Sequence, residues 1–574
     1  MTDHRAWFTS WPSDVPKTKE PYPEVSIYRM FADAAAKFPD HPATAFFGKR
    51  LTYKQLHDDV ERFSGVLVAL GVKQGDRVGL LLPNCPQYLI AWYACQRIGA
   101  IAVGNNPLYT QRELEHQLAD AGIQVMVVLD QVYENFGKVR DAVGIREVIA
   151  TKVTDAMKFP LNVLAPLKFK REAKHEGKPW PPIGPSERVR WWKDLMRQSH
   201  LIPPVAAVDP RHDPAAFVYT GGTTGYSKGA MLSHFNLVSN AIQARALFSE
   251  ARDGDDGIMC VLPFFHSFGT VAMNLGLLHG WKVAMLPRFD LKLTLKELQR
   301  EKPSIFPGVP RLYIQLNEAP ETQKYDLKSI RACVSGASPL PLAVAKRFEE
   351  VTGGAQVVEG YGLTEASPVT HANPVLGKRK EGSIGLPLPD TDCKIVSLED
   401  PDKELAPGER GELCIRGPQV MLGYWNRPDA TAETIRNGWL HTGDVAIMDD
   451  DGYFRIVDRM KELILVSGFN VYPTEIEDVI FRHPKVLKVS VVGIPDDDTG
   501  ERVKAFVVPR PGETVTAEEL DAFCRDPKSG LTGYRVPKDW EFRESLPETL
   551  IGKVLRRVLL EEERAKQAGT GASA

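Results

Sequence analysis

The chain has 574 residues, too many for one ordinary hydrophobic core, so two or more domains are expected. Its 43% hydrophobic and 25% charged residues are typical of a soluble globular protein, and its net charge of −3 excludes a global attraction to nucleic acid. The seven cysteines form no CxxC pair, which excludes a disulfide framework or a zinc knuckle. Because Met1–Glu20 also lacks the apolar segment of a signal peptide, we expect a protein of a reducing compartment, the cytoplasm.

Strand and helix signals alternate over about the first 130 residues. Short apolar runs predict strands at Arg77–Pro83, Ala100–Val103 and Gln124–Leu129, and a helix is predicted at Gln87–Ile98. Alternation of this kind indicates a mostly parallel sheet with helices on its faces. The predicted fold class is therefore α/β.

The composition changes over residues 151–193. Lys152–Lys193 holds ten Lys or Arg against four Asp or Glu, mixed with prolines, three tryptophans and apolar residues. Basic residues beside aromatic and apolar side chains are what a contact with a membrane surface needs, so we expect reversible attachment to anionic membranes, at the inner face. A solvated surface insertion is the alternative interpretation of the same residues.

A glycine-rich loop follows the apolar run Ala215–Tyr219, which predicts a buried strand. Its glycines let backbone N–H groups approach an anion, its threonines add donors, and Lys228 adds a positive charge. The residues expected to bind a polyphosphate are Thr220, Gly221, Gly222, Thr223, Thr224, Gly225 and Lys228. The loop is not a Walker A motif, because Gly229 stands where that motif has Ser or Thr, and a structural turn is the alternative.

Gly257–Trp281 contains no Asp, Glu, Lys or Arg and is long enough to span a bilayer. Pro263, His266 and several glycines interrupt it, so we expect a strand, a loop and a buried helix rather than a transmembrane helix.

Further strands are predicted at Val283–Leu286, Ile330–Val334 and Gln356–Val358. Short alternating segments with Pro-Gly turns between Asp392 and Gly452 indicate a β-rich subdomain. From Arg459 the pattern starts afresh over about 115 residues, enough for a separate α+β domain. We therefore predict an N-terminal domain of residues 1–458 and a C-terminal domain of residues 459–574.

Three further clusters suit nucleotide chemistry. In Glu359–Glu365, a carboxylate beside the Thr364 hydroxyl could hold a hydrated Mg²⁺, and the Tyr361 ring offers a stacking face for a purine. Asp444 is suited to accept hydrogen bonds from both ribose hydroxyls, with Arg459 as a further contact. Near the C-terminus, Lys553 follows Gly552 and could stabilise phosphate charge. The alternatives are a solvated carboxylate, a structural Asp–Arg ion pair and a solvated lysine.

These strings together resemble the adenylate-forming superfamily, which includes acyl-CoA synthetases, peptide-synthetase adenylation domains and firefly luciferase. The resemblance spans about Tyr28 to Arg557 and is closest to bacterial long-chain fatty acyl-CoA ligases; supporting strings are Asn106–Thr110, Pro418–Trp425 and Gly468–Pro473. The chain departs from the family pattern at Ser227, where many members have Pro, and at Ile551, where Thr or Asn is usual.

The resemblance implies a role for each motif residue. The loop with Lys228 would bind the ATP phosphates, Thr364 would touch the α-phosphate, Glu365 would hold Mg²⁺, and Lys553 would be the catalytic lysine. The residues implied in the adenine and ribose pockets are Gly336, Ala337, Glu359, Gly360, Tyr361, Asp444 and Arg459. Those implied in the acyl pocket are His266, Phe268 and Gly362, although His266 reads equally well as a core histidine. The implied interdomain hinge is Lys461, and the implied CoA tunnel is lined by Gly468, Phe469 and Asn470.

The activity that the resemblance implies is the ATP-dependent conversion of a long-chain fatty acid to acyl-AMP and then to acyl-CoA, with Mg²⁺ as cofactor. Two alternatives stay open: an acyl-AMP ligase that loads a carrier protein, and a non-catalytic lipid-binding module at a membrane. Nothing indicates luciferase-like oxidation. Dimers occur in the family, so a homodimer is a further expectation.

Overall fold

The computed structural model describes residues 5–175, 180–184, 187–220, 227–496, 498–526, 531, 533–549 and 554–570. Contacts divide the chain into two compact units. Unit 1 holds Met1–Gly222, Tyr226–Asp392 and Ile415–Leu440, and unit 2 holds Thr223–Gly225, Cys393–Cys414 and His441–Ala574. Each unit is described by itself. The domain boundary between residues 458 and 459 stays a prediction. The two units are defined by their internal contacts, which do not report a movement about Lys461.

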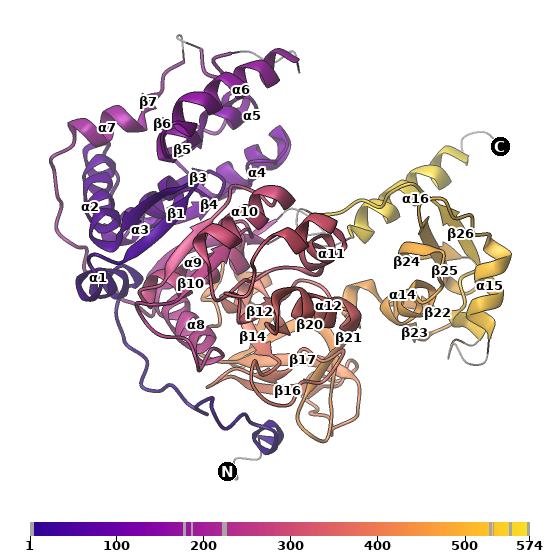
Figure 1. Ribbon diagram of the computed structural model, residues 1–574. Coiled ribbons are helices and arrows are strands. Elements are labelled where there is room, and N and C mark those ends of the chain that lie inside the picture. Colours follow the sequence, from indigo (N-terminus) through magenta and orange to yellow (C-terminus); the bar gives the residue numbers. More distant parts are fainter. Residues whose placement is uncertain are drawn as a thin grey trace. The chain divides into compact units, whose positions relative to one another are not determined.

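The largest sheet of unit 1 carries the predicted phosphate loop at the end of one strand (Figure 1). Its strands, in sheet order, are β18 (Gly423–Tyr424), β9 (Lys228–Ser233), β8 (Pro214–Thr220), β4 (Ile101–Gly104), β3 (Arg77–Leu81), β5 (Val125–Leu129), β6 (Glu147–Thr151) and β7 (Arg190–Trp191). The six strands from β8 to β7 in this order run parallel to one another. Strand β9 pairs antiparallel with β8, and β18 pairs antiparallel with β9. The α/β fold class expected from the alternation of strands and helices is confirmed.

Helices cover both faces of this sheet, because successive side chains of its buried strands point to opposite sides. Val78 and Leu80 of β3 belong to one core cluster and Leu81 to another. The first cluster includes residues of α1 (Ile27–Lys37), α2 (Tyr53–Ala69) and α3 (Pro86–Arg97). The second includes residues of α4 (Gln111–Ala121) and α5 (Tyr133–Val139). Both cores keep the sheet rigid beneath the phosphate loop.

A second group of strands in unit 1 carries the Glu359–Glu365 motif. One sheet has the order β10 (Gly257–Cys260), β11 (Lys282–Met285), β1 (Pro42–Phe46) and β2 (Lys49–Thr52). The other has the order β12 (Ala332–Ser335), β13 (Gln356–Gly362), β14 (Val369–Ala372) and β15 (Leu386–Pro387). Bridges through Ile305 link β10 to β12. The helices of this region are α8 (His234–Ala246), α9 (Ser267–Leu278), α10 (Leu291–Glu301), α11 (Pro310–Glu318) and α12 (Leu342–Thr352), whereas α13 (Pro428–Thr434) packs beside β18.

The uncharged stretch Gly257–Trp281 forms strand β10, a loop and the buried helix α9, as the sequence analysis expects. Helix α9 has 12 residues and packs against α8. Within the part of the chain that the structure describes, no helix has both the length and the hydropathy needed to cross a membrane.

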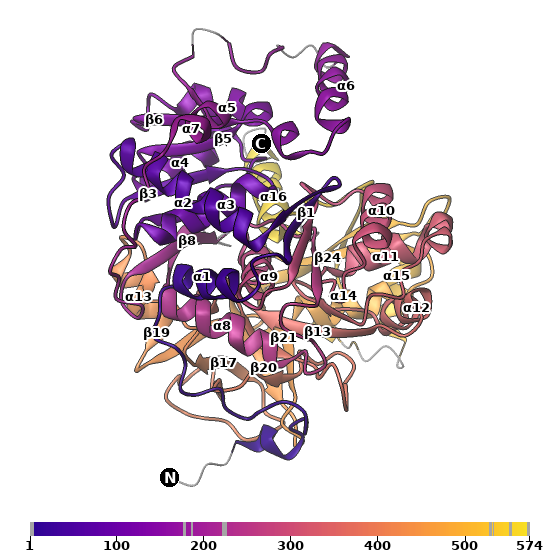
Figure 2. The same cartoon turned by 60° about the vertical axis from the view of Figure 1, so that its left-hand side comes forward.

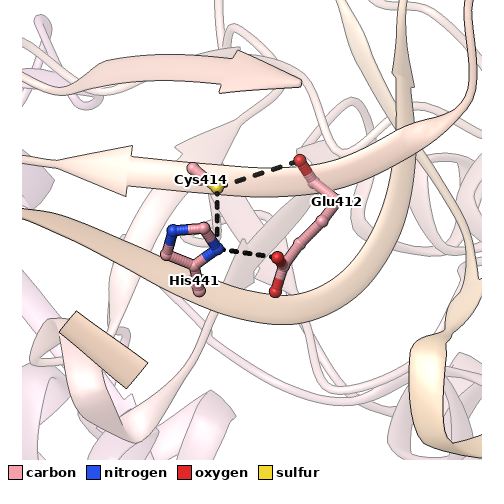
Figure 3. Close-up of side chains that lie close together, drawn as sticks. All are labelled: Glu412, Cys414 and His441. Carbon is pink, nitrogen blue, oxygen red and sulfur yellow. Dashed lines mark hydrogen bonds and ion pairs between the residues drawn. The ribbon is translucent and has the colours of Figure 1, made fainter. Parts of the chain in front are cut away.

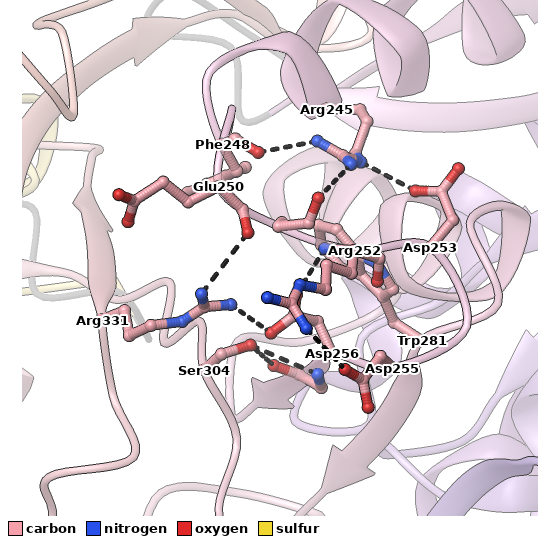
Figure 4. A network of polar contacts seen from close by, with 12 residues as sticks. Arg245, Phe248, Glu250, Arg252, Asp253, Asp255, Asp256, Trp281, Ser304 and Arg331 are labelled. Carbon is pink, nitrogen blue, oxygen red and sulfur yellow. Dashed lines mark hydrogen bonds and ion pairs between the residues drawn. The ribbon is translucent and has the colours of Figure 1, made fainter.

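A polar network fixes the loop between α8 and β10 (Figure 4). Arg245 donates to the carbonyl of Phe248 at 2.7 Å, and Trp281 Nε1 donates to the carbonyl of Arg252 at 3.0 Å. Arg331, just before β12, forms an ion pair with Asp256 of the same loop. The network ties this loop to the strands beside it, and its residues lie outside the predicted motifs.

The predicted β-rich region is a sheet of short strands. Its order is β16 (Asp392–Val396), β17 (Gly411–Arg416), β20 (Trp439–Met448) and β19 (Ile435–Arg436), with β21 (Phe454–Arg459) paired to β20.

The remainder of unit 2 is the α+β structure that the sequence predicts after Arg459. Its sheet has the order β23 (Phe469–Val471), β22 (Ile464–Val466), β25 (Gly500–Pro509) and β24 (Val486–Asp496), with β26 (Asp539–Phe542) paired to β25. Its helices are α14 (Pro473–Phe481), α15 (Ala517–Arg525) and α16 (Arg556–Thr570). Arg556, at the start of α16, forms ion pairs with Asp458, Glu462 and Glu477, which joins this helix to the segment around Lys461.

The basic insertion contains helix α6 (Leu161–His175), none of whose side chains is buried. Phe159 is 74% exposed and Leu167 is 63% exposed, and Leu161, Val163 and Leu164 are exposed as well. Figure 2 shows α6 projecting beside the end of unit 1 that holds β5 and β6. The end of the insertion that holds Trp192 is packed and not exposed. Trp192, in α7 (Trp192–Gln198), is buried and its ring stacks on that of Phe63, with 4.0 Å between the ring centres.

All seven cysteines are free and buried. Burial raises the pKa of the Cys85 thiol to about 12, which keeps it protonated at neutral pH. Among them, Cys260 lies in β10 and Cys333 in β12.

Candidate active site

The predicted phosphate loop connects β8 and β9, two antiparallel neighbours. Its central residues Gly221, Gly222, Thr223, Thr224 and Gly225 lie outside the described residues. At its base, Thr220 and Lys228 are paired in register, and the Thr220 hydroxyl donates to the carbonyl of Lys228 at 3.5 Å.

The strand that follows the loop sets how an anion would be held there. Helix α8 begins only at His234, after β9, so the loop does not lead directly into a helix N-terminus. An anion would therefore depend on loop N–H groups, hydroxyls and the charge of Lys228, without a helix dipole.

Lys228 and Glu365 both contact one tyrosine, Tyr424. The Tyr424 hydroxyl donates to Glu365 Oε1 at 2.6 Å, and Lys228 Nζ lies 4.9 Å from the centre of the Tyr424 ring. The structure thus joins the predicted phosphate lysine to the predicted metal ligand through a residue that the sequence analysis did not select. The string Pro418–Trp425 marked this segment as family-like, but its sequence carries no sign of contact with Glu365.

Glu365 and Thr364 lie in a short 3₁₀ turn, Thr364–Ala366. The backbone of Glu365 is fixed by the N–H of Met421, which donates to its carbonyl at 2.8 Å. The Thr364 hydroxyl lies 3.3 Å from that of Ser267, at the start of α9.

Part of the Glu359–Glu365 motif is strand, which corrects the expectation that the whole motif follows a strand. Glu359 to Gly362 belong to β13, which pairs with β12 through Glu359 and then with β14 from Gly360. The glycines allow close packing: a Cβ on Gly360 would lie 2.8 Å from Val334 Cγ1, and one on Gly362 would lie 2.1 Å from the carbonyl oxygen of Pro368.

The predicted adenine-pocket residues come from two segments that lie together. A Cβ on Gly336 would lie 3.1 Å from the Phe268 ring and 3.3 Å from the carbonyl of Gly360. Next to it, Ala337 is exposed with φ of 71°, a conformation that residues other than glycine seldom adopt outside turns and functional sites. The Tyr361 ring contacts His371 edge-on at 5.9 Å.

Glu359 supports the loop that follows Gly336. Its Oε1 accepts the N–H of Leu340 at 3.1 Å, and burial raises the pKa of its carboxyl to about 7. This carboxyl therefore changes its charge near neutral pH.

His266 caps helix α9. Its Nδ1 accepts the N–H of Phe268 at 3.2 Å, and burial lowers the pKa of the imidazole to about 4, so the ring is neutral at pH 7. The core-histidine interpretation accounts for these contacts, and a role in the acyl pocket stays a prediction.

In unit 2, Asp444 and Arg459 face each other across β20 and β21. They form an ion pair of 3.0 Å in which the Asp444 side chain is 4% exposed. The structural ion pair named as the alternative is therefore present, and ribose binding by these two residues stays a prediction.

The part of β20 before Asp444 is held by Glu412 of β17 (Figure 3). Glu412 Oε1 accepts the N–H of Gly443 at 3.0 Å, and Oε2 lies 2.7 Å from His441 Nδ1. Cys414 Sγ lies 3.4 Å from the same nitrogen. Glu412, Cys414 and His441 could in principle hold a metal ion, but hydrogen bonds account for their positions.

The predicted hinge and CoA segments lie in described parts of unit 2. Lys461 is exposed in the 3₁₀ turn Met460–Glu462. Gly468 has φ of 82°, Phe469 is exposed and stacks on Tyr534 at 5.1 Å, and Asn470 is exposed in β23. Lys553 lies outside the described residues.

The residues around Glu365 fit the Mg²⁺ that the resemblance implies. Carboxylate and hydroxyl oxygens are the ligands this ion prefers, and Thr364 supplies a hydroxyl beside the Glu365 carboxylate. Among the described residues, Oε2 of Glu365 has no hydrogen-bond partner, so one carboxylate oxygen is available to a metal ion.

Known proteins match this chain along nearly its whole length. The profile of the AMP-binding enzyme family matches residues 31–425, and that of the AMP-binding enzyme C-terminal domain matches residues 475–553. The long-chain-fatty-acid–CoA ligase of Bacillus subtilis (strain 168) is 43% identical over 98% of this chain and 99% of its own, and that of Escherichia coli O157:H7 is 41% identical over the same shares. The crystal structure of ATP-bound MatB from Rhodopseudomonas palustris is 30% identical and superposes with a TM-score of 0.79, covering 94% of this chain and 99% of that one.

Proposed function

Because the chain belongs to the AMP-binding enzyme family, we propose that it is a long-chain-fatty-acid–CoA ligase that forms acyl-CoA, AMP and pyrophosphate from a fatty acid, ATP and CoA. The observation that carries this proposal is the 43% identity to a ligase of that name over 98% of the chain. The contact of Lys228 and Glu365 with one tyrosine supports it, since two residues needed for MgATP lie together.

In the first half-reaction, a carboxylate oxygen of the fatty acid bonds to the α-phosphorus of ATP, and the bond to the bridging oxygen breaks, releasing pyrophosphate. Lys228 and the loop after Thr220 hold the phosphates, and Thr364 orients the α-phosphate. Mg²⁺ bound at Glu365 would offset charge on the phosphate oxygens. Lys553 contributes a further positive charge as pyrophosphate leaves.

Two sets of residues are proposed to bind the nucleoside of ATP. Gly336, Ala337, Glu359, Gly360 and Tyr361 line the adenine pocket. Asp444 accepts hydrogen bonds from the ribose hydroxyls, and Arg459 adds a further contact. Close packing at Gly336 supports this assignment, because a side chain there would meet the Phe268 ring.

In the second half-reaction, the CoA thiolate attacks the acyl carbonyl carbon, and the bond from that carbon to the AMP oxygen breaks. The C-terminal domain, residues 459–574, turns about Lys461 between the half-reactions, which withdraws Lys553 and brings Gly468, Phe469 and Asn470 to the pantetheine tunnel. The acyl chain lies in a pocket lined by His266, Phe268 and Gly362. This rotation of a whole domain is expected to limit the rate of turnover.

Pyrophosphate release tests the reaction class. It is measured with MgATP and, in turn, acetate, octanoate, palmitate or 4-coumarate, each with and without CoA. Palmitate-dependent release, with acyl-CoA formed only when CoA is present, is the expected result. Palmitoyl-AMP that is discharged to a carrier protein and not to CoA would favour the acyl-AMP ligase, and binding of palmitate without pyrophosphate release would favour the lipid-binding module.

We further propose that helix α6 attaches the protein reversibly to anionic membranes. Its exposed apolar side chains and the basic residues of the insertion together fit a surface of acyl chains beneath acidic headgroups. A location at the inner face of the membrane follows from this proposal.

Vesicle pelleting tests α6. The double variant Leu164→Gln, Leu167→Gln should pellet less with phosphatidylglycerol vesicles than the unchanged protein, and phosphatidylcholine vesicles should retain neither. The matched control is Leu201→Gln, Ile202→Gln, which changes two exposed aliphatic residues outside the insertion. Equal pelleting of both double variants would exclude α6 as the contact. Point changes are preferable to deletion of residues 152–193, which would remove the buried Trp192.

The homodimer expected from the family resemblance is a separate proposal. Light scattering tests it, since a dimer has twice the 63.8 kDa mass of one chain.

A further inference from the structure

The segment around Tyr424 is fastened to both the lysine strand and the carboxylate turn. On one side, β18 pairs with β9 so that Tyr424 lies opposite Ala230, and the N–H of Trp425 donates to the carbonyl of Gly229 at 2.8 Å. On the other side, Met421 donates to the carbonyl of Glu365. The backbone therefore fixes Tyr424 between the strand that begins with Lys228 and the turn that contains Glu365.

The hydroxyl of Tyr424 has one defined role in this position. Tyr424 is buried, and its hydroxyl donates to Glu365 Oε1 at 2.6 Å. This bond occupies one carboxylate oxygen and leaves Oε2 for a metal ion. The ring face at the same time lies near the Lys228 ammonium, a geometry that attracts a cation.

Lys228 and Glu365 carry opposite charges, and both contact Tyr424. Even so, no direct ion pair joins these two described residues. A direct pair would neutralise the ammonium that an ATP phosphate needs and would occupy the carboxylate that Mg²⁺ needs. ATP would then have to break that pair before binding.

We propose that Tyr424 is a positioning residue that keeps Lys228 and Glu365 apart, with its ring holding the lysine for an ATP phosphate and its hydroxyl orienting the carboxylate for Mg²⁺. This inference rests on the proposed function, because it takes MgATP as the ligand of both groups. It adds a residue that the motif analysis did not select.

Two variants separate the two parts of the proposal. Tyr424→Phe removes the hydroxyl and keeps the ring, whereas Tyr424→Leu removes both. The matched control is Tyr22→Phe, which removes a phenol that donates to Asp390 at 2.8 Å in another part of unit 1. Calorimetric titration with ATP is carried out in Mg²⁺ and in EDTA, and pyrophosphate release is measured against Mg²⁺ concentration.

Tyr424→Phe should weaken ATP binding in Mg²⁺ and raise the half-saturating Mg²⁺ concentration, each by about ten- to a hundredfold, as expected for one lost hydrogen bond to a charged group. Its affinity for ATP in EDTA should stay unchanged. Tyr424→Leu should weaken binding in both conditions, because the lysine loses its ring as well. Tyr22→Phe should behave as the unchanged protein.

Two results would overturn the proposal. One is Tyr424→Phe with the Mg²⁺ dependence of the unchanged protein. The other is an equal loss of ATP affinity with and without Mg²⁺ in both variants, which would indicate a purely structural role. If the unchanged protein binds MgATP but releases no pyrophosphate with any acid, the ligase proposal fails, and the calorimetric comparison still decides the role of Tyr424.

Discussion

Replacing Arg556 with methionine should destabilise unit 2 strongly. The Arg556 side chain is 15% exposed and lies 2.6 Å from Glu477 and 3.5 Å from Asp458, with Glu462 as a third ion-pair partner. Methionine fills similar space without charge, so three carboxylates lose their shared counter-charge. Breaking a buried ion pair by removing one partner typically costs about 3–5 kcal/mol. For a unit of this size that corresponds to a fall of about 6–20 °C in its unfolding temperature.

The loss should also depend on pH in a defined direction. Burial raises the pKa values of Asp458 and Glu477, and Arg556 opposes that rise. A carboxyl with a raised folded-state pKa contributes stability that is present below its unfolded pKa and is lost as pH rises through the folded value. Removal of Arg556 raises the folded values further, so the variant should be nearest to the unchanged protein at acid pH and should fall further below it as the pH rises.

Differential scanning calorimetry of the full chain measures this effect. The matched control is Arg557→Met, because Arg557 is exposed and forms only a 3.5 Å surface pair with Glu561, worth about 0.3–0.5 kcal/mol. A chain of two units need not unfold in one step. The calorimetric transition compared is therefore the one whose midpoint temperature changes in Arg556→Met and not in Arg557→Met. Equal transitions for the two variants at neutral pH would refute the reasoning.

Three further outcomes are expected. Lys553→Ala should abolish adenylation but leave thioesterification of supplied acyl-AMP largely intact, and equal loss in both half-reactions, measured by pyrophosphate release and acyl-CoA formation, would contradict its role. Glu359→Gln should flatten the pH dependence of the free energy of unfolding, because the neutral carboxyl of Glu359 stabilises the fold below its unfolded pKa and this stabilisation is lost as the pH rises through about 7. Denaturant titrations from acid to neutral pH should therefore show a smaller fall in the free energy of unfolding for the variant. Gly362→Ala should lower the unfolding temperature and weaken ATP binding, because its Cβ would lie 2.1 Å from the carbonyl oxygen of Pro368; unchanged calorimetric values would show that the turn relaxes freely.

Apolar patterning predicted most of the strands and helices that support the site. Apolar runs and their periodicity depend only on neighbouring residues. They are sufficient to predict the strand before the phosphate loop, the buried helix α9 and the separate α+β structure after Arg459. Tertiary contacts also set where β22 begins: the strand starts at Ile464, after the 3₁₀ turn Met460–Glu462, in which Glu462 pairs with Arg556.

Tertiary contacts explain what the sequence missed. The strand predicted at Gln356–Val358 continues to Gly362 in β13, because Gly360 and Gly362 have no side chains and permit close packing there. Tyr424 and Glu365 are 59 residues apart, and no local pattern links them. Trp192 reads as part of a membrane contact beside basic residues, yet it packs on Phe63 within the core.

The burial of every native thiol makes the chain a convenient host for site-specific labels. Maleimide reagents need an accessible thiolate, and burial both shields these sulfurs and holds the Cys85 thiol in its protonated form at neutral pH. One cysteine introduced on the surface of each unit would therefore take nearly all of a fluorescent or spin label without prior removal of native cysteines. Distances between such labels, recorded with ATP, with acyl-AMP and with CoA, would test the proposed movement about Lys461 directly in solution.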